Sequence, residues 1–297
     1  MTETGTDTAS GPRTGTDTAS GPRTGTPAQT PISGTTRLYV VVGDPVAQVR
    51  SPGLLNPLFA EQGVDAVLVP VEVRPDSLER VVRGLQRIGN LDGIFVTVPH
   101  KADAARLAER RSRAVEIAGT ANVLRREPDG SWLAENFDGS GFVAGLARAG
   151  YEVRGRRVTL AGAGGAGSAI AAALLTAGAD RVAVTDPDLP KLEALVDRLA
   201  GYWPGRVHAA AEPPLHDSDL AVNATPLGLR PGDPLPFPPE ELAPGSVVAD
   251  IIMKPHETAL LREAAALGHH IHHGIHMLTG QVASYCAFFG LRAPANG

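Results

Sequence analysis

Short apolar runs alternate with longer segments that carry apolar residues at helical spacing along most of the chain. The runs are rich in valine, leucine and isoleucine, as buried strands are, and they are bounded by turn residues. They predict strands at 37–42, 65–71, 93–98, 157–161, 181–186, 220–223 and 246–252. The intervening segments predict helices at 51–62, 75–87, 166–177 and 190–200, with a further helical pattern beyond Gly274. This alternation predicts an α/β fold with a parallel, doubly wound sheet.

The alternation falls into two series, 36–138 and 139–275, and a final helical segment follows over 276–297. The sequence before them is different in kind. The decapeptide TGTDTASGPR occurs twice in tandem from Thr4 to Arg23, and it lacks the apolar residues that would offset the entropy cost of ordering. We therefore expect residues 1–35 to be a disordered low-complexity tail with no catalytic role. The alternative is a tail that recruits a partner.

Composition narrows the classes of function. The chain has 297 residues and a net charge of −5, without a Lys/Arg cluster that could form a phosphate-binding stripe, so nucleic acid is not an expected partner. No apolar run approaches the roughly 20 residues of a membrane span, so no membrane partner is expected either. The single cysteine, Cys286, cannot form an internal disulfide, which favours a reducing, cytoplasmic setting.

A glycine-rich turn follows the strand predicted at 157–161. The segment Gly162-Ala163-Gly164-Gly165-Ala166-Gly167 contains the G-x-G-x-x-G pattern and leads directly into an alanine-rich helix. In a dinucleotide-binding loop, the first glycine permits the tight turn, the second the approach of a pyrophosphate, and the third close contact of helix and strand. The N–H groups at the helix N-terminus would face the phosphates. The candidate cofactor-binding residues here are Gly162, Gly164, Gly165, Ala166 and Gly167.

Asp186 ends the next predicted strand. A carboxylate at this position can accept hydrogen bonds from the ribose hydroxyls of NAD and would repel the 2′-phosphate of NADP. Lys191 is the only nearby cation. We therefore expect NAD to be the preferred cofactor, with NADP as the second candidate. The alternative is that Asp186 is only a turn or helix-capping residue.

Seven segments of the chain resemble, in order, segments of the shikimate/quinate dehydrogenase family. They are Gly43–Pro52, Val96–Lys101, Gly119–Asn122, Asn136–Gly139, Asn223–Gly228, Asp250–Thr258 and Gly274–Gln281. The resemblance implies an N-terminal α/β substrate domain over 36–138 and a Rossmann-type doubly wound dinucleotide-binding domain over 139–275. It also implies that the C-terminal helix returns to the first domain and that the active site lies in the interdomain cleft.

The same resemblance implies a reaction and roles for individual residues. The expected reaction is reversible hydride transfer between NAD(P) and a ring hydroxyl of shikimate, quinate or a related cyclic hydroxy acid. Such an oxidation needs an acid–base group within reach of the hydroxyl, and Lys101 with Asp138 matches the family's catalytic pair. The matching substrate contacts are Ser51, Thr97, Asn122 and Gln281, and the further cofactor contacts are Asn223, Thr225 and Gly274. Family members include monomers and homodimers, so either state is expected.

Four positions depart from the family pattern. Val49 stands where the family usually has a serine, Phe95 where it has an asparagine, Phe137 where it has a threonine and Met253 where it has a tyrosine. Each change replaces a polar group by apolar surface. We expect a divergent enzyme that uses shikimate poorly, or that prefers quinate or a less polar relative. The alternative is that some of these side chains point away from the substrate.

Two further hypotheses concern other classes of function. His269, His270, His272, His273 and His276 form a dense cluster, but alternate strand residues face opposite sides, no acidic or cysteine residue lies among them, and the resemblance calls for no metal. We therefore expect no metal site. The competing function is a non-enzymatic NAD- or metabolite-binding module, which would keep the glycine loop but would not need Lys101 and Asp138.

Overall fold

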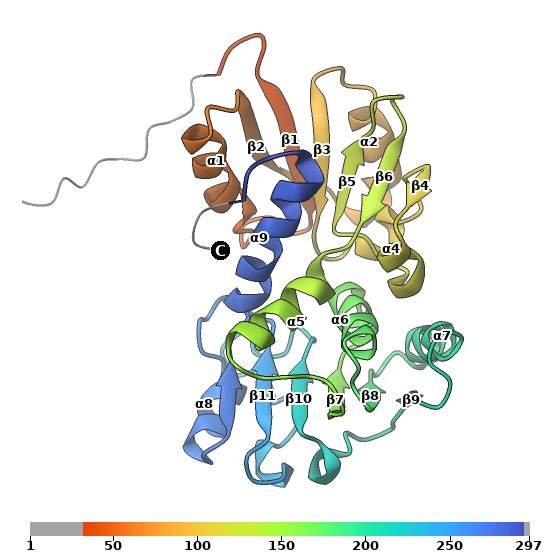
Figure 1. The fold of residues 1–297 in the computed structure, drawn as a ribbon, viewed down its shortest axis with the longest axis vertical. Helices are drawn as coiled ribbons and strands as arrows, with labels where there is room; N and C mark the ends of the chain where they lie inside the picture. Colours follow the sequence, from red (N-terminus) through yellow and green to blue (C-terminus); the bar gives the residue numbers. More distant parts are fainter. Residues whose placement is uncertain (1–31, 294–297) are drawn as a thin grey trace, which may run out of the picture.

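The computed structural model describes residues 32–293, which fold around two six-stranded sheets. In Figure 1 the sheets lie one above the other, with α5 (Asp138–Arg148) and α9 (Ile275–Phe289) running between them. The predicted tail lies outside the described residues, except for its last four positions.

The first sheet is mixed, with strand order β2-β1-β3-β5-β6-β4. Its strands are β1 (Arg37–Gly43), β2 (Ala66–Glu72), β3 (Leu91–Val96), β4 (Arg110–Arg111), β5 (Val123–Arg126) and β6 (Trp132–Glu135). Strand β1 pairs in parallel with β2 and β3, whereas β5 is antiparallel to both β3 and β6. A tight turn with Gly130 at φ +85° joins β5 to β6.

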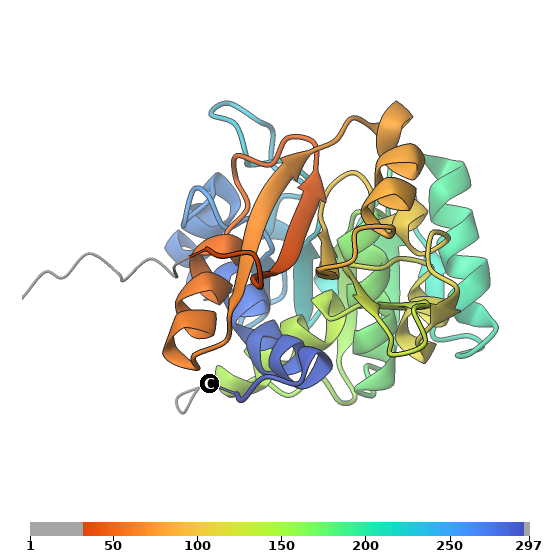
Figure 2. The same ribbon diagram turned by 90° about the horizontal axis from the view of Figure 1, so that it is seen from above.

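Helices cover both faces of this sheet. Helix α2 (Leu78–Leu85), preceded by the 3₁₀ turn η1 (Pro75–Ser77), packs on one face near α3 (Lys101–Ala104) and α4 (Arg113–Ala118). Helix α1 (Ser51–Glu61) packs on the other face, and there it meets the C-terminal half of α9. Tyr285 and Cys286 of α9 are buried with Leu55 and Phe59 of α1, and the two helices lie near each other in both views (Figure 1, Figure 2). The end of the chain therefore packs on the sheet formed by its beginning.

The second sheet is fully parallel, with strand order β12-β11-β10-β7-β8-β9. Its strands are β7 (Arg157–Ala161), β8 (Arg181–Thr185), β9 (Val207–Ala209), β10 (Leu220–Asn223), β11 (Val247–Asp250) and β12 (His270–His272). Counted within this sheet, the order is 3-2-1-4-5-6, the doubly wound arrangement that binds dinucleotides where the order reverses. That point lies between β7 and β10.

Buried helices complete this second unit. Helices α5, α6 (Gly165–Thr176) and α7 (Leu189–Ala200) cover one face through a core of leucine, isoleucine, valine and alanine. Helix α8 (Ala259–Ala266) and the segment with the 3₁₀ turns η2 (Leu215–Asp217) and η3 (Pro239–Glu241) cover the other face. The α/β fold class predicted from the sequence is confirmed. The boundary at 138/139 stays a prediction, and it falls at the start of α5.

Most predicted elements are present with small shifts in their ends. The strand expected to reach residue 98 ends at Val96, because Thr97 onwards turns into α3. The helix expected from 75 begins as a 3₁₀ turn, and the strand expected over 246–252 spans Val247–Asp250. Within residues 32–293, no helix has both the length and the apolar character that a membrane crossing demands.

Candidate active site

A small cavity of about 100 Å³ lies at the carboxyl ends of β1 and β3, beside α5 and α9. All six residues expected to contact or transform the substrate line it: Ser51, Thr97, Lys101, Asn122, Asp138 and Gln281. They come from five separate stretches of the chain. The topology therefore brings together side chains that lie up to 230 positions apart in the sequence.

Lys101 and Asp138 form a buried ion pair in this cavity. The Lys101 Nζ donates to Asp138 Oδ2 at 2.6 Å, and the two residues are only 8% and 3% exposed. Lys101 begins α3 and Asp138 begins α5, so each charge is held at a helix end. Because an unpaired charge at this depth would cost several kcal/mol, each partner keeps the other in place.

The Lys101 side chain also lies against the glycine loop. A Cβ on Gly165 would stand 2.7 Å from Lys101 Cβ, closer than real Cβ atoms approach. The Thr120 hydroxyl also donates to the carbonyl of Gly165 at 3.0 Å. Gly165 is therefore required by contact with the first sheet's loops, a role that the G-x-G-x-x-G pattern does not include.

An amide network forms the floor of the cavity. Asn122 Nδ2 lies within hydrogen-bonding distance of Asp138 Oδ1 (3.1 Å), Gln281 Oε1 (3.1 Å) and Tyr285 Oη (3.0 Å). Gln281 Nε2 donates to Asp138 Oδ1 at 3.3 Å, and the Tyr285 hydroxyl donates to Gln281 Oε1. Burial, and then the negative charge of Asp138, raises the pKa of Tyr285 well above its ordinary value. Tyr285 therefore stays a neutral hydrogen-bond donor.

The exposed Arg50 marks the mouth of the cavity, and several polar side chains of the lining lack a partner among the residues that the structure describes. Within residues 32–293, no hydrogen bond or ion pair engages the Ser51 hydroxyl, the Thr97 hydroxyl or the Arg50 guanidinium. The charged residues that line the cavity are Arg50, Lys101 and Asp138, which leaves one excess positive charge. A cavity with this balance suits a ligand that carries one carboxylate.

Three of the four departures from the family pattern lie at this cavity. Val49, Phe95 and Met253 line it and give it apolar walls. Phe137 does not line it: its ring packs edge-on against Tyr285 and Phe288, with centroids 5.3 and 5.5 Å away. For Phe137, the alternative that the side chain points away from the substrate therefore fits the structure.

The glycine loop has the geometry of the dinucleotide-binding fingerprint. Gly162 has φ +104°, and a Cβ there would meet the Ala224 carbonyl oxygen at 2.8 Å. A Cβ on Gly167 would stand 2.0 Å from the Gly162 oxygen, so helix and strand touch at this point. In contrast, a Cβ on Gly164 would meet nothing within 4 Å, and no side chain caps α6 there. The loop therefore offers open backbone and free N–H groups to a phosphate, as NAD(P) requires.

Asp186 directly follows β8 and is anchored to the glycine loop. Its Oδ2 accepts from the Ala163 N–H at 2.7 Å and pairs with Lys191 Nζ at 2.9 Å, while Oδ1 accepts from the Asp188 N–H. Burial alone would raise the pKa of Asp186, but these hydrogen bonds outweigh it and hold the pKa below its ordinary value. Since a carboxylate accepts about four hydrogen bonds, one acceptor position remains for a ribose hydroxyl.

The three remaining expected cofactor contacts lie at the ends of β10 and β12. Asn223 is fully buried: its amide donates to Leu227 O and Asp250 Oδ2, and its oxygen accepts from Thr225. Its side chain therefore shapes the loop after β10. A Cβ on Gly274 would stand 2.5 Å from the backbone of Ile251, so this glycine permits close packing of two loops. Asn223 and Gly274 thus fix the backbone of two loops, and it is this backbone, rather than their side chains, that would contact a cofactor.

The histidines lie apart from the substrate cavity, where β12 and α9 meet α5. His272 is 3% exposed, and its ring lies between Phe142 and His276, with centroids 5.9 and 4.9 Å away. Burial, and then the neighbouring His276 and His273, lowers the pKa of His272 to about 4. Among the described residues, no group of three or more His, Cys, Asp or Glu side chains has a geometry that could hold a metal ion. His276 is exposed and does not line the cavity.

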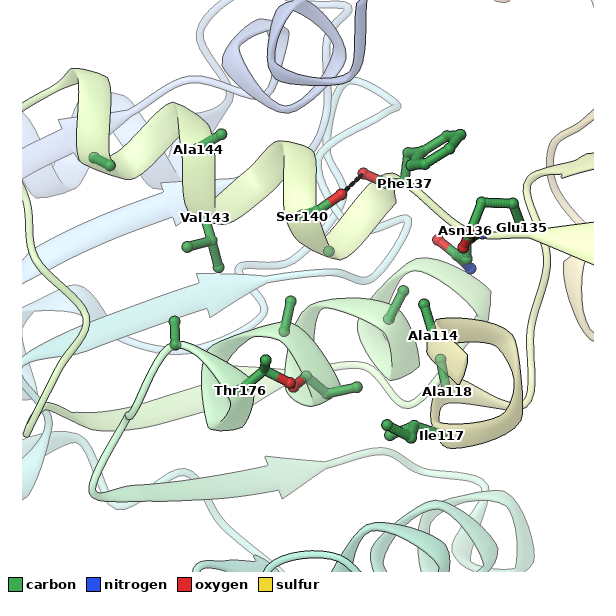
Figure 3. Close-up of a pocket in the computed structure, with 16 residues that line it drawn as sticks. Ala114, Ile117, Ala118, Glu135, Asn136, Phe137, Ser140, Val143, Ala144 and Thr176 are labelled. Atoms are coloured by element: carbon green, nitrogen blue, oxygen red, sulfur yellow. Dashed lines mark hydrogen bonds between the residues drawn. The ribbon is translucent and has the colours of Figure 1, made fainter. Parts of the chain in front are cut away.

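A larger cavity of about 510 Å³ lies between α4, α5 and α6 (Figure 3). Alanines dominate its lining, and Glu135 is its only titratable residue. Size alone would favour it as the active site, but acid–base chemistry requires groups that the smaller cavity holds. We therefore place the reaction in the smaller cavity.

Comparison with known proteins agrees with this geometry. Residues 41–124 match the model of the shikimate dehydrogenase substrate binding domain. The shikimate dehydrogenase (NADP(+)) of Rubrobacter xylanophilus is 42% identical over 242 residues, which cover 80% of this chain and 84% of that protein. The chain belongs to the shikimate dehydrogenase family.

Solved structures of the family agree as well. The shikimate 5-dehydrogenase of Listeria monocytogenes, in complex with shikimate and NAD, has a TM-score of 0.79 and 26% identity, over 89% of this chain and 95% of that one. The quinate dehydrogenase of Corynebacterium glutamicum, in complex with NAD, has a TM-score of 0.77 and 27% identity, over 87% and 95% of the two chains. The family predicted from the seven sequence segments is confirmed.

Two residues of the site are absent from the sequence-based prediction. Arg50 lies between Val49 and Ser51, and its positive charge is the signal that would have marked it as an anion partner. Tyr285 lies four residues after Gln281, one helical turn along α9, and this spacing puts both side chains on one face. That i, i+4 relation is the signal that would have found it.

Proposed function

We propose that this protein is an NAD(P)-dependent dehydrogenase that oxidises a ring hydroxyl of a cyclic hydroxy acid and catalyses the reverse reduction. The observation that carries the proposal is the buried Lys101–Asp138 pair in a cavity next to the glycine loop. A binding module would not need a buried ion pair there, because the pair costs desolvation free energy without serving affinity for a dinucleotide.

Residues that line the cavity have separate roles in this reaction. During oxidation, Lys101 first releases a proton to solvent and the neutral amine then accepts the proton of the substrate hydroxyl; during reduction, the protonated amine donates it back. Asp138 fixes the amine by its 2.6 Å contact. Arg50 and Ser51 hold the carboxylate at the mouth, and Thr97 and Gln281 orient the ring. NAD(P), when bound, supplies the hydride acceptor or donor. The apolar walls and the small volume exclude water from the reacting atoms.

We propose further that NAD is preferred over NADP. The support is the Asp186 carboxylate, whose lowered pKa keeps it ionised and whose remaining acceptor position suits a ribose hydroxyl. Lys191 offsets part of the repulsion that a 2′-phosphate would meet, so NADP is the slower cofactor rather than an excluded one. The name of the Rubrobacter relative carries NADP(+), and solved relatives of the family hold NAD in some structures and NADP in others.

Steady-state kinetics test both proposals. Shikimate and quinate are each offered with NAD and with NADP, and reduced nicotinamide is followed by absorbance. We expect turnover with at least one acid, and a higher kcat/KM with NAD than with NADP. Absence of turnover with both acids would remove the proposed substrates, and equal or faster turnover with NADP would remove the cofactor preference.

A further inference from the structure

Tyr285 takes a place in the active-site network that a hydroxyl of the substrate could otherwise take. Its Oη accepts from Asn122 Nδ2 and donates to Gln281 Oε1. A hydroxyl both accepts and donates, so one donor and one acceptor on neighbouring amides form a complete binding position for it. In this protein, the phenol of α9 fills that position.

The side-chain amides of Asn122 and Gln281 have few hydrogen-bond donors and acceptors left for a ligand. Asn122 Oδ1 accepts from the Phe137 N–H at 3.0 Å, and the two hydrogens of Asn122 Nδ2 are shared among three acceptors. Gln281 Oε1 accepts from both Asn122 and Tyr285, and one Gln281 hydrogen is directed to Asp138 Oδ1. One N–H of Gln281 is therefore the only donor that the two amides can still offer a ligand, and the second lone pair of Asn122 Oδ1 is the only remaining acceptor.

Aromatic packing holds Tyr285 in this position. Its ring meets Phe95 with centroids 5.0 Å apart and Phe137 with centroids 5.3 Å apart, and the residue is 5% exposed. Phe95 and Tyr285 both line the cavity. The cavity wall beside Asn122 and Gln281 is therefore formed by aromatic rings that are fixed by contacts on two sides. These rings offer a substrate hydroxyl no replacement for the hydrogen bonds that Tyr285 makes with the two amides.

Both amides bond to Asp138, whose carboxylate fixes the amine of Lys101. When the reacting hydroxyl lies at the Lys101 amine, a substituent on the next ring carbon would therefore point at Asn122, Gln281 and Tyr285. We propose that Tyr285 is a specificity-determining residue that selects cyclic hydroxy acids lacking a hydroxyl next to the reacting one. This inference rests on the proposed dehydrogenase function, and it names the substrate class for that site.

The test compares shikimate, which has this neighbouring hydroxyl, with 4-deoxyshikimate, which lacks it. For the wild-type protein we expect kcat/KM to favour 4-deoxyshikimate by about tenfold, because Tyr285 occupies the donor and acceptor that a buried hydroxyl would need in its place. Tyr285→Ala frees the amide donor and acceptor and opens space, so the ratio should move toward shikimate by roughly tenfold or more. Tyr285→Phe keeps the ring and its packing, and should move the ratio in the same direction by a smaller factor.

Tyr39→Phe is the matched control. Tyr39 is a buried tyrosine of the same aromatic cluster, packed on Phe59 and Phe289, and it does not line the cavity. Removal of its hydroxyl should leave the ratio between the two acids unchanged. A ratio is also insensitive to a partial loss of folded protein, which would lower both rates together.

Binding of the same two acids is also measured by calorimetry in the presence of NAD. This measurement distinguishes a failure of the specificity role of Tyr285 from a failure of the proposed dehydrogenase function. If the affinity ratio shifts in Tyr285→Ala but no variant reduces NAD, the specificity role holds and the dehydrogenase proposal fails. If wild-type protein binds or turns over shikimate at least as well as 4-deoxyshikimate, or if neither Tyr285 variant changes the ratio, the specificity role is overturned.

Discussion

At the scale of single residues, the chemistry of the site depends on which charged and hydrogen-bonding atoms already have a partner in the protein. Lys101 and Asp138 neutralise each other in a cavity where either charge alone would be costly. Arg50 carries the cavity's excess positive charge at its mouth. This arrangement places the acid–base pair at one end of a ligand and a cation at the other. It matches a molecule with a reacting hydroxyl and a carboxylate on one ring.

Cofactor choice is also decided by one side chain. Asp186→Asn keeps an acceptor for the Ala163 N–H and removes the charge that a 2′-phosphate would meet. We expect the ratio of kcat/KM for NADP to that for NAD to rise by roughly tenfold, because one close charge repulsion is lost. Steady-state kinetics with both cofactors measure this ratio.

Asp188→Asn is the control for that change. Asp188 is an exposed carboxylate two positions away that caps α7 through the Lys191 N–H, and asparagine caps equally well. Its replacement should leave the cofactor ratio where it is. A rise of similar size in both variants would show that general surface charge, and not Asp186, sets the preference.

The six residues named from the sequence line one cavity, since each lies within a segment that resembles the family, and their roles stay predictions. The sequence did not predict Tyr285 or the engagement of both Asn122 amide hydrogens. Hydrogen-bond partners depend on the distance between α9 and the loop after α4, which only the packed structure defines. The role of Phe137 was undecided for a similar reason: its direction depends on the aromatic cluster of α9.

At the scale of elements, the four glycines of the glycine loop serve different purposes. Gly167 and Gly162 permit backbone contacts, Gly165 permits the approach of Lys101, and Gly164 faces open space. The same Gly→Ala change therefore has different consequences at neighbouring positions.

Gly164→Ala and Gly167→Ala form a matched pair. Gly167→Ala should lower the free energy of unfolding by about 3 kcal/mol or more, because its Cβ overlaps the Gly162 carbonyl. Gly164→Ala should leave stability near that of wild type but raise the Kd of NAD by about tenfold or more, since its methyl lies where a pyrophosphate approaches. Thermal unfolding and calorimetric titration with NAD measure the two effects. Unchanged NAD affinity in Gly164→Ala would contradict the assigned path of the pyrophosphate.

The antiparallel part of the first sheet was missed from the sequence, as were helices α4, α5 and α8. Strands β5 and β6 are only four residues long and contain charged residues, so their apolar pattern is weak. Asp129-Gly130 between them is a hairpin signal that could have found them. The long parallel strands of valine were easier to predict because their burial on both faces produces continuous apolar runs.

At the scale of the whole molecule, α5 and α9 connect the two sheets, and the buried His272 lies at that junction. Folded His272 binds a proton only near pH 4, whereas an unfolded histidine does so near ~6.5. As pH falls between these values, the unfolded state takes up the proton first, so the folded state becomes less stable.

We therefore expect His272 to lower the free energy of unfolding by about 2 kcal/mol between pH 7 and pH 5. In His272→Gln this contribution should disappear, whereas His270→Gln, an exposed neighbour on β12, should retain it. Urea unfolding at the two pH values measures the difference. An equal fall in wild type and His272→Gln would contradict the role of this histidine.

The most direct test of the central claim, that Lys101 and Asp138 perform acid–base chemistry for hydride transfer, separates turnover from cofactor binding. Wild-type protein and Lys101→Met are each titrated with NAD and then assayed for NADH formation with the best cyclic hydroxy acid. We predict equal Kd values for NAD and a fall in kcat of about 10²–10⁴ in the variant. Undiminished turnover in Lys101→Met, or the absence of NADH from wild-type protein with every cyclic hydroxy acid offered, would contradict the claim.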